Sequence, residues 1–337
     1  MKKFKIFSAL ALSTLALTTG AFLTACGGVA DGMYTENGLI FKVENQSVYI
    51  TGVEEGTTEV TIPAEFRDLT VYAIEEEAFK DSTVTKISFE EKDYRLFSIG
   101  VHAFDNSAIK EIINLPANVT MGDKVLSGLK NLEKITVYGT GEYYIENGNL
   151  IKDDTDLFTD EEIKILVLAP ANMQPTANFD NGTYTITGVD EVYDYAFDSN
   201  RFITDIIIEE DVKRIESYAF QNVVLNSITI KNTDRFDIFI DGTAFDAHKD
   251  LKIYVPATTD YEMDSWLGNT NFLQSHNWLI HPESCTRDDM HMHGLRNTLA
   301  DGTIWGYDYS LNDEGTMANI KINSSTSAMQ SYPGYMR

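Results

Sequence analysis

The feature that most constrains the fold is a pair of residues, alanine followed by phenylalanine, that returns at a nearly fixed interval. The pair occurs at Ala78-Phe79, Ala103-Phe104, Ala196-Phe197, Ala219-Phe220 and Ala244-Phe245, and Val125-Leu126 fills the same role. Successive second members are 25, 22, 71, 23 and 25 residues apart, and the long interval is about three periods. A period of this size is typical of a solenoid, in which one small unit stacks on the next.

Apolar residues around each pair follow the same period. Five residues before the second member of each pair stands a large apolar residue: Ile74, Ile99, Met121, Val192, Ile215 and Ile240. After the pair comes a Leu-x2-Ile-x-Ile pattern, at residues 84–89, 132–137, 203–208 and 225–230. Its alternation of apolar and polar residues indicates a half-buried strand. A unit of about 23 residues has too little apolar surface to fold alone, so coils must share one core. A β-sandwich also has many short strands, but it does not predict a pair returning at a fixed interval.

The first 25 residues are typical of a bacterial lipoprotein signal peptide. Lysines near the start precede an apolar stretch at residues 7–23, and Leu23-Thr24-Ala25 stands directly before Cys26, as in a lipobox. We expect cleavage before Cys26, a diacylglycerol on its thiol, and a glycine-rich tether over residues 26–33. An ordinary secretory peptide with a chance cysteine is the alternative.

Taken together, these motifs resemble the BspA-like (Treponema pallidum-type) leucine-rich repeat proteins. The repeat of that family reads approximately Ile-x-Ile-Pro, then Val-x2-Ile-Gly-x3-Ala-Phe, then Leu-x2-Ile. Here Val60-Thr61-Ile62-Pro63 leads to Ile74 and then to Ala78-Phe79, and Leu115-Pro116 leads to Met121-Gly122. Residues 37–52 are similar to the N-terminal hairpin of the family, and residues 144–170 to its elongated central repeat. The resemblance covers residues 36–281 and implies a mainly β leucine-rich-repeat solenoid, with roles in adhesion.

We therefore expect a solenoid over residues 34–256 with a cap at each end. The N-terminal hairpin closes one end. At the other, Thr259-Asp260-Tyr261-Glu262 has the form of a capping box, so residues 257–281 are predicted to form a short helical C-terminal cap. Residues 282–337 lack the repeat and are rich in Gly, Ser, Asn and Asp, which predicts a loosely ordered tail.

The charge excludes some partners. The chain has 26 Lys and Arg against 52 Asp and Glu, for a net charge of −26, or −29 once the three lysines of the signal are removed. Nucleic acid is not expected as a partner, since affinity for a polyanion comes mainly from Lys and Arg. The membrane is reached only through the lipid on Cys26, and a protein or glycan outside the cell is the expected ligand.

Motifs for catalysis or for a cofactor are missing from the sequence. There is no nucleophile elbow, no His-Glu-x2-His and no phosphate loop, so no enzyme and no cofactor are expected. An acidic run at residues 153–162 lacks the ligand order of a calcium loop and is interpreted as a solvated hairpin tip. His281, Cys285, His291 and His293 are of ligand types that zinc prefers, but their spacing matches no established site, and a polar segment is the preferred interpretation.

The strand pattern selects one candidate binding face. The middle residue of each Ile-x-Ile strand must face solvent, and stacking places these residues in one file. The predicted file is Thr61, Ser88, Asn114, Thr136, Ile207, Thr229 and Tyr254. Strand propensity alone accounts for Thr and Ser, whereas exposed Ile207 and Tyr254 are typical of contact points.

Two functions remain from the sequence, with a third that is weaker. The favoured one is a lipid-anchored binding protein of the bacterial cell surface that holds a protein or glycan in adhesion or recognition. A structural envelope lipoprotein that binds a partner on its own cell is the alternative. A metal-binding protein that uses the His and Cys residues of the tail comes third.

Overall fold

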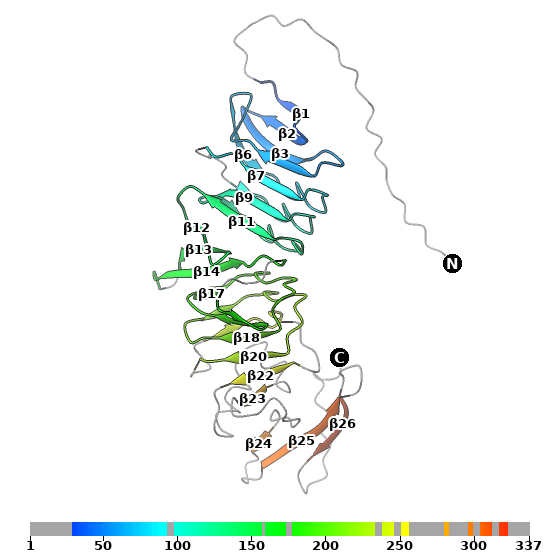
Figure 1. Cartoon of the computed structure of the whole chain (residues 1–337), viewed down its shortest axis with the longest axis vertical. Coiled ribbons are helices and arrows are strands. Elements are labelled where there is room, and N and C mark those ends of the chain that lie inside the picture. Colours follow the sequence, from blue (N-terminus) through cyan, green and yellow to red (C-terminus); the bar gives the residue numbers. More distant parts are fainter. Residues whose placement is uncertain are drawn as a thin grey trace, which may run out of the picture.

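The computed structural model describes residues 29–92, 98–156, 159–172, 177–232, 238–245 and 251–255, and the strands at 280–282, 296–298, 304–311 and 317–322. These residues form an elongated stack of coils, with the N-terminal strands at one end and the C-terminal strands at the other (Figure 1). The regular elements of this described part are strands, which confirms the predicted mainly β solenoid. No helix in it is long and apolar enough to span a membrane.

In the N-terminal half, each coil contributes a strand to each of two sheets. Sheet N1 contains β1 (Gly32–Glu36), β2 (Leu39–Glu44), β3 (Ser47–Val53), β6 (Leu69–Ile74), β8 (Ser98–Ile99) and β10 (Thr120–Met121), in that order, with β5 (Glu65–Phe66) attached to β6. Sheet N2 contains β4 (Glu59–Ile62), β7 (Lys86–Phe89), β9 (Glu111–Pro116) and β11 (Lys134–Tyr138). The coil-to-coil pairs in both sheets are parallel, as stacking of similar coils requires.

The C-terminal half repeats this arrangement in two further sheets. Sheet C1 contains β12 (Tyr143–Glu146), β13 (Asn149–Thr155), β14 (Glu162–Leu168), β17 (Glu191–Val192), β19 (Arg214–Ile215) and β21 (Phe239–Ile240). Sheet C2 contains β15 (Phe179–Asp180), β16 (Thr183–Ile186), β18 (Asp205–Ile208), β20 (Ser227–Ile230), β22 (Lys252–Val255) and β23 (Ile280–Pro282). Paired residues of neighbouring coils are 22 apart at Tyr184 and Ile206 and 27 apart at Val60 and Ile87, close to the predicted period.

The N-terminal end is closed by the predicted hairpin. Strands β1, β2 and β3 pair antiparallel, and β3 then pairs parallel with β6, so the cap joins the stack through its last strand. Strand β1 begins at Gly32, two residues before the predicted start of the solenoid at Tyr34. The signal segment, Cys26 and the first residues of the tether lie outside the described residues.

The phenylalanine of each repeat lies in the core, as predicted. Phe79, Phe104, Phe197 and Phe220 are fully buried, and Phe245 and Leu126 are nearly so. The rings of Phe197 and Phe220 stack with centroids 4.6 Å apart, and those of Phe220 and Phe245 with centroids 4.8 Å apart. Each ring thus covers the ring of the next coil, and one column of aromatic contacts runs along the C-terminal half.

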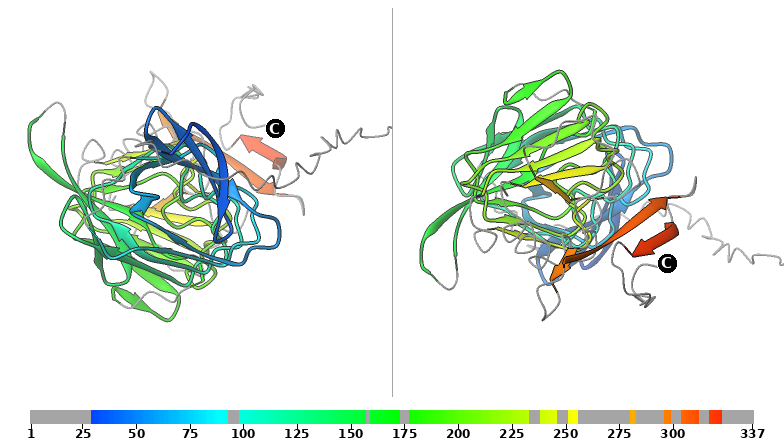
Figure 2. Two further views of the ribbon diagram at one scale, coloured as in Figure 1. Left: turned by 90° about the horizontal axis from the view of Figure 1, so that it is seen from above. Right: turned by 90° about the horizontal axis from the view of Figure 1, so that it is seen from below.

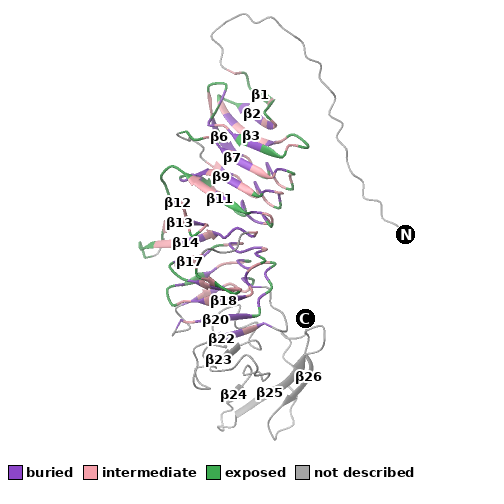
Figure 3. Ribbon diagram, viewed as in Figure 1, coloured by how far each residue is buried: buried purple, intermediate pink, exposed green. Residues whose placement is uncertain are grey.

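The buried apolar residues divide into two clusters that meet at the central repeat. The N-terminal core extends from Leu39 to Ile135 and includes Leu150 and Leu168. The C-terminal core extends from Ile151 and Leu166 to Ile253. Figure 3 shows buried positions along the whole described stack. Because β13 and β14 contribute residues to both clusters, this hairpin joins the two halves, and its tip projects from the side of the solenoid (Figure 2).

The turn that carries each Ala-Phe pair has an unusual backbone. The residue before the first member of the pair has a positive φ in successive coils: Glu77, His102, Lys124, Tyr195 and Tyr218. The residue four positions later does as well: Asp81, Asn106, Gly128, Ser199 and Asn222. Most of these positions hold Asn, Asp, Gly or residues on the surface, because the left-handed region disfavours bulky buried side chains. The turned backbone lets the Phe79 N–H donate to the Ala103 carbonyl of the next coil at 2.8 Å.

Strands are present in the tail, which was predicted to be loosely ordered. Strands β24 (Arg296–Thr298), β25 (Ile304–Leu311) and β26 (Met317–Ile322) form a separate antiparallel sheet. Trp305, Tyr307 and Tyr309 alternate with other residues, which is a period typical of strands. The prediction for the tail used its amino-acid composition and did not take this period into account. The predicted helical cap, residues 257–281, lies outside the described residues except for the start of β23.

Candidate functional site

The outward file begins as predicted in sheet N2 but changes at its third strand. Backbone pairing aligns Thr61 with Ser88, and Ser88 with Ile113 rather than with Asn114. Thr61 is exposed, and Ser88 and Ile113 are partly exposed. The predicted place of Asn114 in the file is therefore wrong, and Ile113 occupies it.

The reason is a β-bulge between β9 and β11. The register shifts between Ile135 and Val137, so that Ile113 and Asn114 together lie opposite Thr136. Asn114 has a φ of 60°, which asparagine tolerates better than most residues. Its N–H donates to Thr136 Oγ1 at 2.8 Å, and its side-chain amide donates to Glu91 Oε1 at 3.0 Å. Asn114 thus holds the bulge together at the edge of the file.

In sheet C2 the file contains one residue that the sequence prediction missed. Pairing aligns Thr185, Ile207, Thr229 and Tyr254 in four successive strands. Thr185 lies between Tyr184 and Ile186, both buried, and that alternation is the signal that could have found it. Tyr254 is only 7% exposed, so the expectation that it is an exposed contact point is wrong, whereas Ile207 is partly exposed, as Ser88 and Ile113 are. Strand β23 continues the sheet beyond β22 with His281 opposite Tyr254, so Tyr254 does not lie at the edge.

The file is also divided in two. Sheets N2 and C2 are separate, since β11 is the last strand of N2 and β15 the first of C2. We call the two parts the N file (Thr61, Ser88, Ile113, Thr136) and the C file (Thr185, Ile207, Thr229, Tyr254). Each part is continuous, with neighbouring members spaced about 4.8 Å apart.

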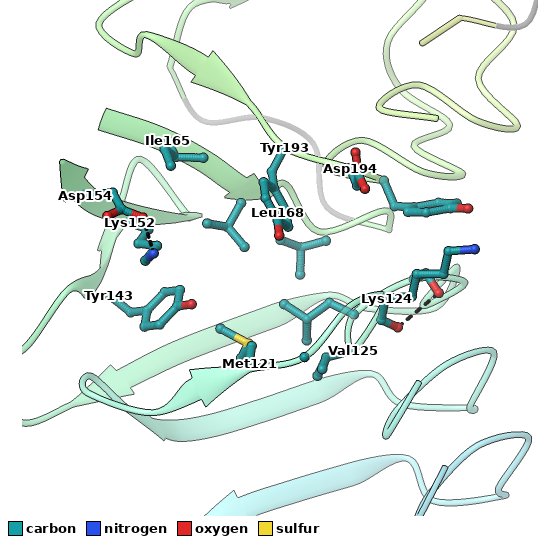
Figure 4. Close-up of a pocket in the computed structure, with 15 residues that line it drawn as sticks. Met121, Lys124, Val125, Tyr143, Lys152, Asp154, Ile165, Leu168, Tyr193 and Asp194 are labelled. Atoms are coloured by element: carbon teal, nitrogen blue, oxygen red, sulfur yellow. Dashed lines mark hydrogen bonds and ion pairs between the residues drawn. The ribbon is translucent and has the colours of Figure 1, made fainter. Parts of the chain in front are cut away.

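A pocket of about 180 Å³ lies where sheet N1 ends and sheet C1 begins. We call it the seam pocket. Its lining comes from the coil after β10, from β12 to β14, and from the coil after β17; the lining residues include Met121, Lys124, Val125, Tyr143, Lys152, Asp154, Ile165, Leu168, Tyr193 and Asp194 (Figure 4). Strand β10 pairs with β8 on one side only, so the stack is interrupted there.

A carboxylate spans the interruption at one edge of the pocket. In regular coils, the backbone N–H at the second positive-φ position donates to a carbonyl of the next coil, as Asn106 does to Ser127 at 3.2 Å. Gly128 stands at the corresponding place beside the seam, and its N–H donates instead to Asp198 Oδ2 at 3.0 Å. Asp198 also accepts from the Asn222 side-chain amide at 2.9 Å. A side chain therefore replaces the missing backbone contact, and the coils separate enough to leave the pocket.

Burial shifts the pKa values of several groups around the seam pocket. Burial raises the pKa of the Tyr143 and Tyr193 phenols, which therefore remain protonated donors at neutral pH. Burial, with the nearby charge of Glu216, raises the pKa of Asp194. A hydrogen bond from Lys152 lowers the pKa of Asp154. The pocket thus combines neutral hydroxyls with carboxylates and ammonium groups.

The described residues contain no group of three or more His, Cys, Asp or Glu side chains that could hold a metal ion. The acidic run lies at the end of the β13–β14 hairpin, and its Asp153, Asp160, Glu161 and Glu162 are exposed, as expected for a solvated tip. Of the weak metal candidates, His281 is in β23, and Cys285, His291 and His293 lie outside the described residues.

The repeat itself decides the family. A family model described as the BspA type leucine-rich repeat region matches in six copies, over residues 56–152 and 181–271, which together make up more than half of the chain. The chain belongs to the BspA-type leucine-rich repeat family. The region between the two matched segments contains the tip of the β13–β14 hairpin and β14, so the elongated central repeat is where this BspA-type protein departs from the regular pattern.

Solved structures with some similarity are also leucine-rich repeat proteins. A leucine-rich cell surface protein from Faecalibacterium prausnitzii is 14% identical over 76% of this chain and 96% of its own, with a TM-score of 0.30. A leucine-rich repeat protein from Bacteroides ovatus is 21% identical over 66% of this chain and 55% of its own, with a TM-score of 0.39. The T. pallidum leucine-rich repeat protein is 13% identical over 72% of this chain and 99% of its own, with a TM-score of 0.29. Among curated proteins no match is found. The family assignment rests on the repeat alone.

Proposed function

We propose that this BspA-type protein is a lipid-anchored binding protein of the bacterial cell surface, which holds a protein or glycan ligand by an extended contact. The observation that carries the proposal is the pair of outward files. Backbone pairing keeps Thr61, Ser88 and Ile113 in register on one sheet, and Thr185, Ile207 and Thr229 on the other. Ser, Thr and Ile side chains in register, without long or charged groups among them, leave a flat surface that a partner can approach closely along several coils.

Charge supports a basic partner. The net charge is −26 and the exposed turns are rich in Asp and Glu, so basic groups on a ligand are favoured and repulsion keeps copies of the chain apart. Exposed charge pairs are screened by salt, with a Debye length of about 8 Å at physiological ionic strength. Binding is therefore expected to weaken as salt is added.

The binding test uses the mature chain with Cys26 replaced by Ala, labelled with a fluorophore. We expect it to bind foreign cells or immobilised extracellular-matrix proteins. Binding only to the envelope of the cell that produces it would instead favour the structural lipoprotein. The variant Thr185→Lys, Ile207→Lys, Thr229→Lys places three cations on the C file and is expected to lose binding at least tenfold.

A matched control distinguishes loss of the C-file surface from the effect of adding three positive charges. Asn118→Lys, Thr140→Lys, Val224→Lys adds the same three cations at exposed positions outside both files. Circular dichroism checks that both variants fold. Equal binding by the two triple variants would show that the C file is not the contact surface.

The anchor is tested separately. Metabolic labelling with a clickable fatty acid is expected to mark the wild-type chain and not Cys26→Ala, because the thiol of Cys26 is the proposed site of lipidation. Label that persists in Cys26→Ala would refute the anchor and leave the binding face unaffected.

A further inference from the structure

The seam pocket has the size of a single substituted ring. Its volume is about 180 Å³, slightly more than the roughly 150 Å³ of a cavity that binds benzene. It opens at the surface beside Tyr193, whose side chain is 43% exposed. A small ring can therefore enter from solvent and lie against that tyrosine.

Two phenol groups point into the cavity, and both come from sheet C1 or the residue that follows one of its strands. Figure 4 shows Tyr143, from β12, and Tyr193, just after β17, directed toward the same space. Among the described residues, neither hydroxyl is hydrogen-bonded to another side chain. Tyr143 is only 7% exposed, so a purely apolar occupant would leave its buried hydroxyl without a partner, which costs free energy.

The charged groups around the pocket balance. Lys152 is paired with Asp154, and Lys124 lies over the ring of Tyr195 at 5.5 Å, opposite Asp194 in the lining. A net cation or a net anion would therefore meet a group of its own sign as well as one of the opposite sign. A neutral molecule with several hydroxyls can accept from the phenols and the ammonium groups and donate to the carboxylates.

We propose that the seam pocket binds one neutral hexopyranose ring, with an apolar face of the sugar against Tyr193 and its hydroxyls hydrogen-bonded to Tyr143 and Asp194. Met121, Val125 and Leu168 provide apolar lining. The pocket lies at the boundary of sheets N1 and C1, whereas the two files lie on sheets N2 and C2. This site is consequently independent of the contact surface of the proposed function, and either can fail without the other.

The experiment measures saturation-transfer difference NMR of the mature chain with methyl glycosides of glucose, galactose, mannose and N-acetylglucosamine. A ligand of this size is expected to bind with a Kd of about 1 mM. Tyr193→Ala should weaken that binding at least tenfold, and Tyr193→Phe, which keeps the ring, should weaken it less. Met121→Trp should abolish it by filling the cavity.

Tyr72→Ala is the matched control, since Tyr72 is an exposed tyrosine at 41% on strand β6 and does not line the pocket. The affinity of Tyr72→Ala for the pyranosides is expected to equal that of the wild type. Butylamine and N-acetyl-leucine amide serve as probes of the cationic and apolar alternatives. The proposal is overturned if no pyranoside binds, if either of these probes binds more tightly than every pyranoside, or if both Tyr193→Ala and Met121→Trp retain wild-type affinity.

Discussion

At the scale of single residues, the aromatic column joins the cores of successive coils. Phe220 is fully buried between Phe197 and Phe245, with both rings stacked on it. Phe220→Ala is expected to lower the free energy of unfolding by about 3–5 kcal/mol, because a buried ring is lost and a cavity remains. Urea denaturation measures this loss. Val224→Ala is the control, since Val224 is 72% exposed and its truncation should leave the midpoint nearly unchanged.

One acidic residue makes stability depend on pH in an unusual direction. Burial raises the pKa of Glu191 above 4.5, although Arg214 partly offsets the shift. The folded state therefore holds the proton more tightly than the unfolded state does, and its stability increases as pH falls through the raised pKa. Glu191→Gln mimics the protonated form.

The expected outcome for Glu191→Gln is a higher unfolding midpoint than wild type at pH 7 and no difference at a pH below 4.5, the usual value for glutamate. Thermal unfolding at the two pH values measures both midpoints. Glu65→Gln, at an exposed position on β5, should match the wild type at each pH. A midpoint of Glu191→Gln below that of wild type at pH 7 would show that the ion pair with Arg214 outweighs burial.

At the scale of elements, close approach of neighbouring coils is concentrated at a few glycines. A Cβ on Gly100 would lie 2.5 Å from the backbone nitrogen of Glu76, and the Gly100 N–H donates to the Ile74 carbonyl at 2.9 Å. Gly100→Ala is expected to destabilise the protein by about 1–3 kcal/mol through overpacking. Glu75→Ala, at the equivalent place one coil earlier, should change the free energy of unfolding by less than about 0.5 kcal/mol in the same denaturation experiment. Equal effects of the two substitutions would contradict the close packing of coils at Gly100.

The period of the Ala-Phe pair was enough to predict the strands, the buried phenylalanines and the stacking, because each depends on residues within one repeat. The bulge at Asn114 could not be predicted in the same way. In Ile112-Ile113-Asn114-Leu115, either Ile113 or Asn114 can be taken as the outward residue, and only pairing with Thr136 decides between them. The burial of Tyr254 depends on what lies beyond the repeats, including β23, which no repeat motif marks.

The seam pocket was missed for a related reason. Its lining comes from three segments that are brought together only when the central repeat interrupts sheet N1. The sequence does contain a local signal, because Tyr193 occupies the place that glycine has at positions 100 and 122, after the corresponding apolar residue of the repeat. The sequence does not show how β13 and β14 pair, so it does not show which residues lie across the pocket from that tyrosine.

At the scale of the whole molecule, the two cores should respond separately to damage. Phe220 belongs to the C-terminal core, and the hairpin β13–β14 is shared by both. Coils interact mainly with their neighbours, so a local loss should spread only a short distance. In Phe220→Ala, hydrogen exchange is expected to accelerate in residues 183–255 much more than in residues 39–116. Equal acceleration in both halves would show that the two cores unfold as one unit.

The stacking of coils also determines how the molecule would behave under mechanical load. The backbone hydrogen bonds between coils, such as that from Gly122 to Ile99, run along the long axis of the stack. A pulling force along that axis therefore acts on these bonds one coil interface at a time. Each coil of about 23 residues contributes about 5 Å to the folded length and up to about 80 Å when its chain is extended. A molecule held at one end by a lipid and at the other by a ligand would therefore lengthen one coil at a time under tension. The remaining coils would stay folded meanwhile.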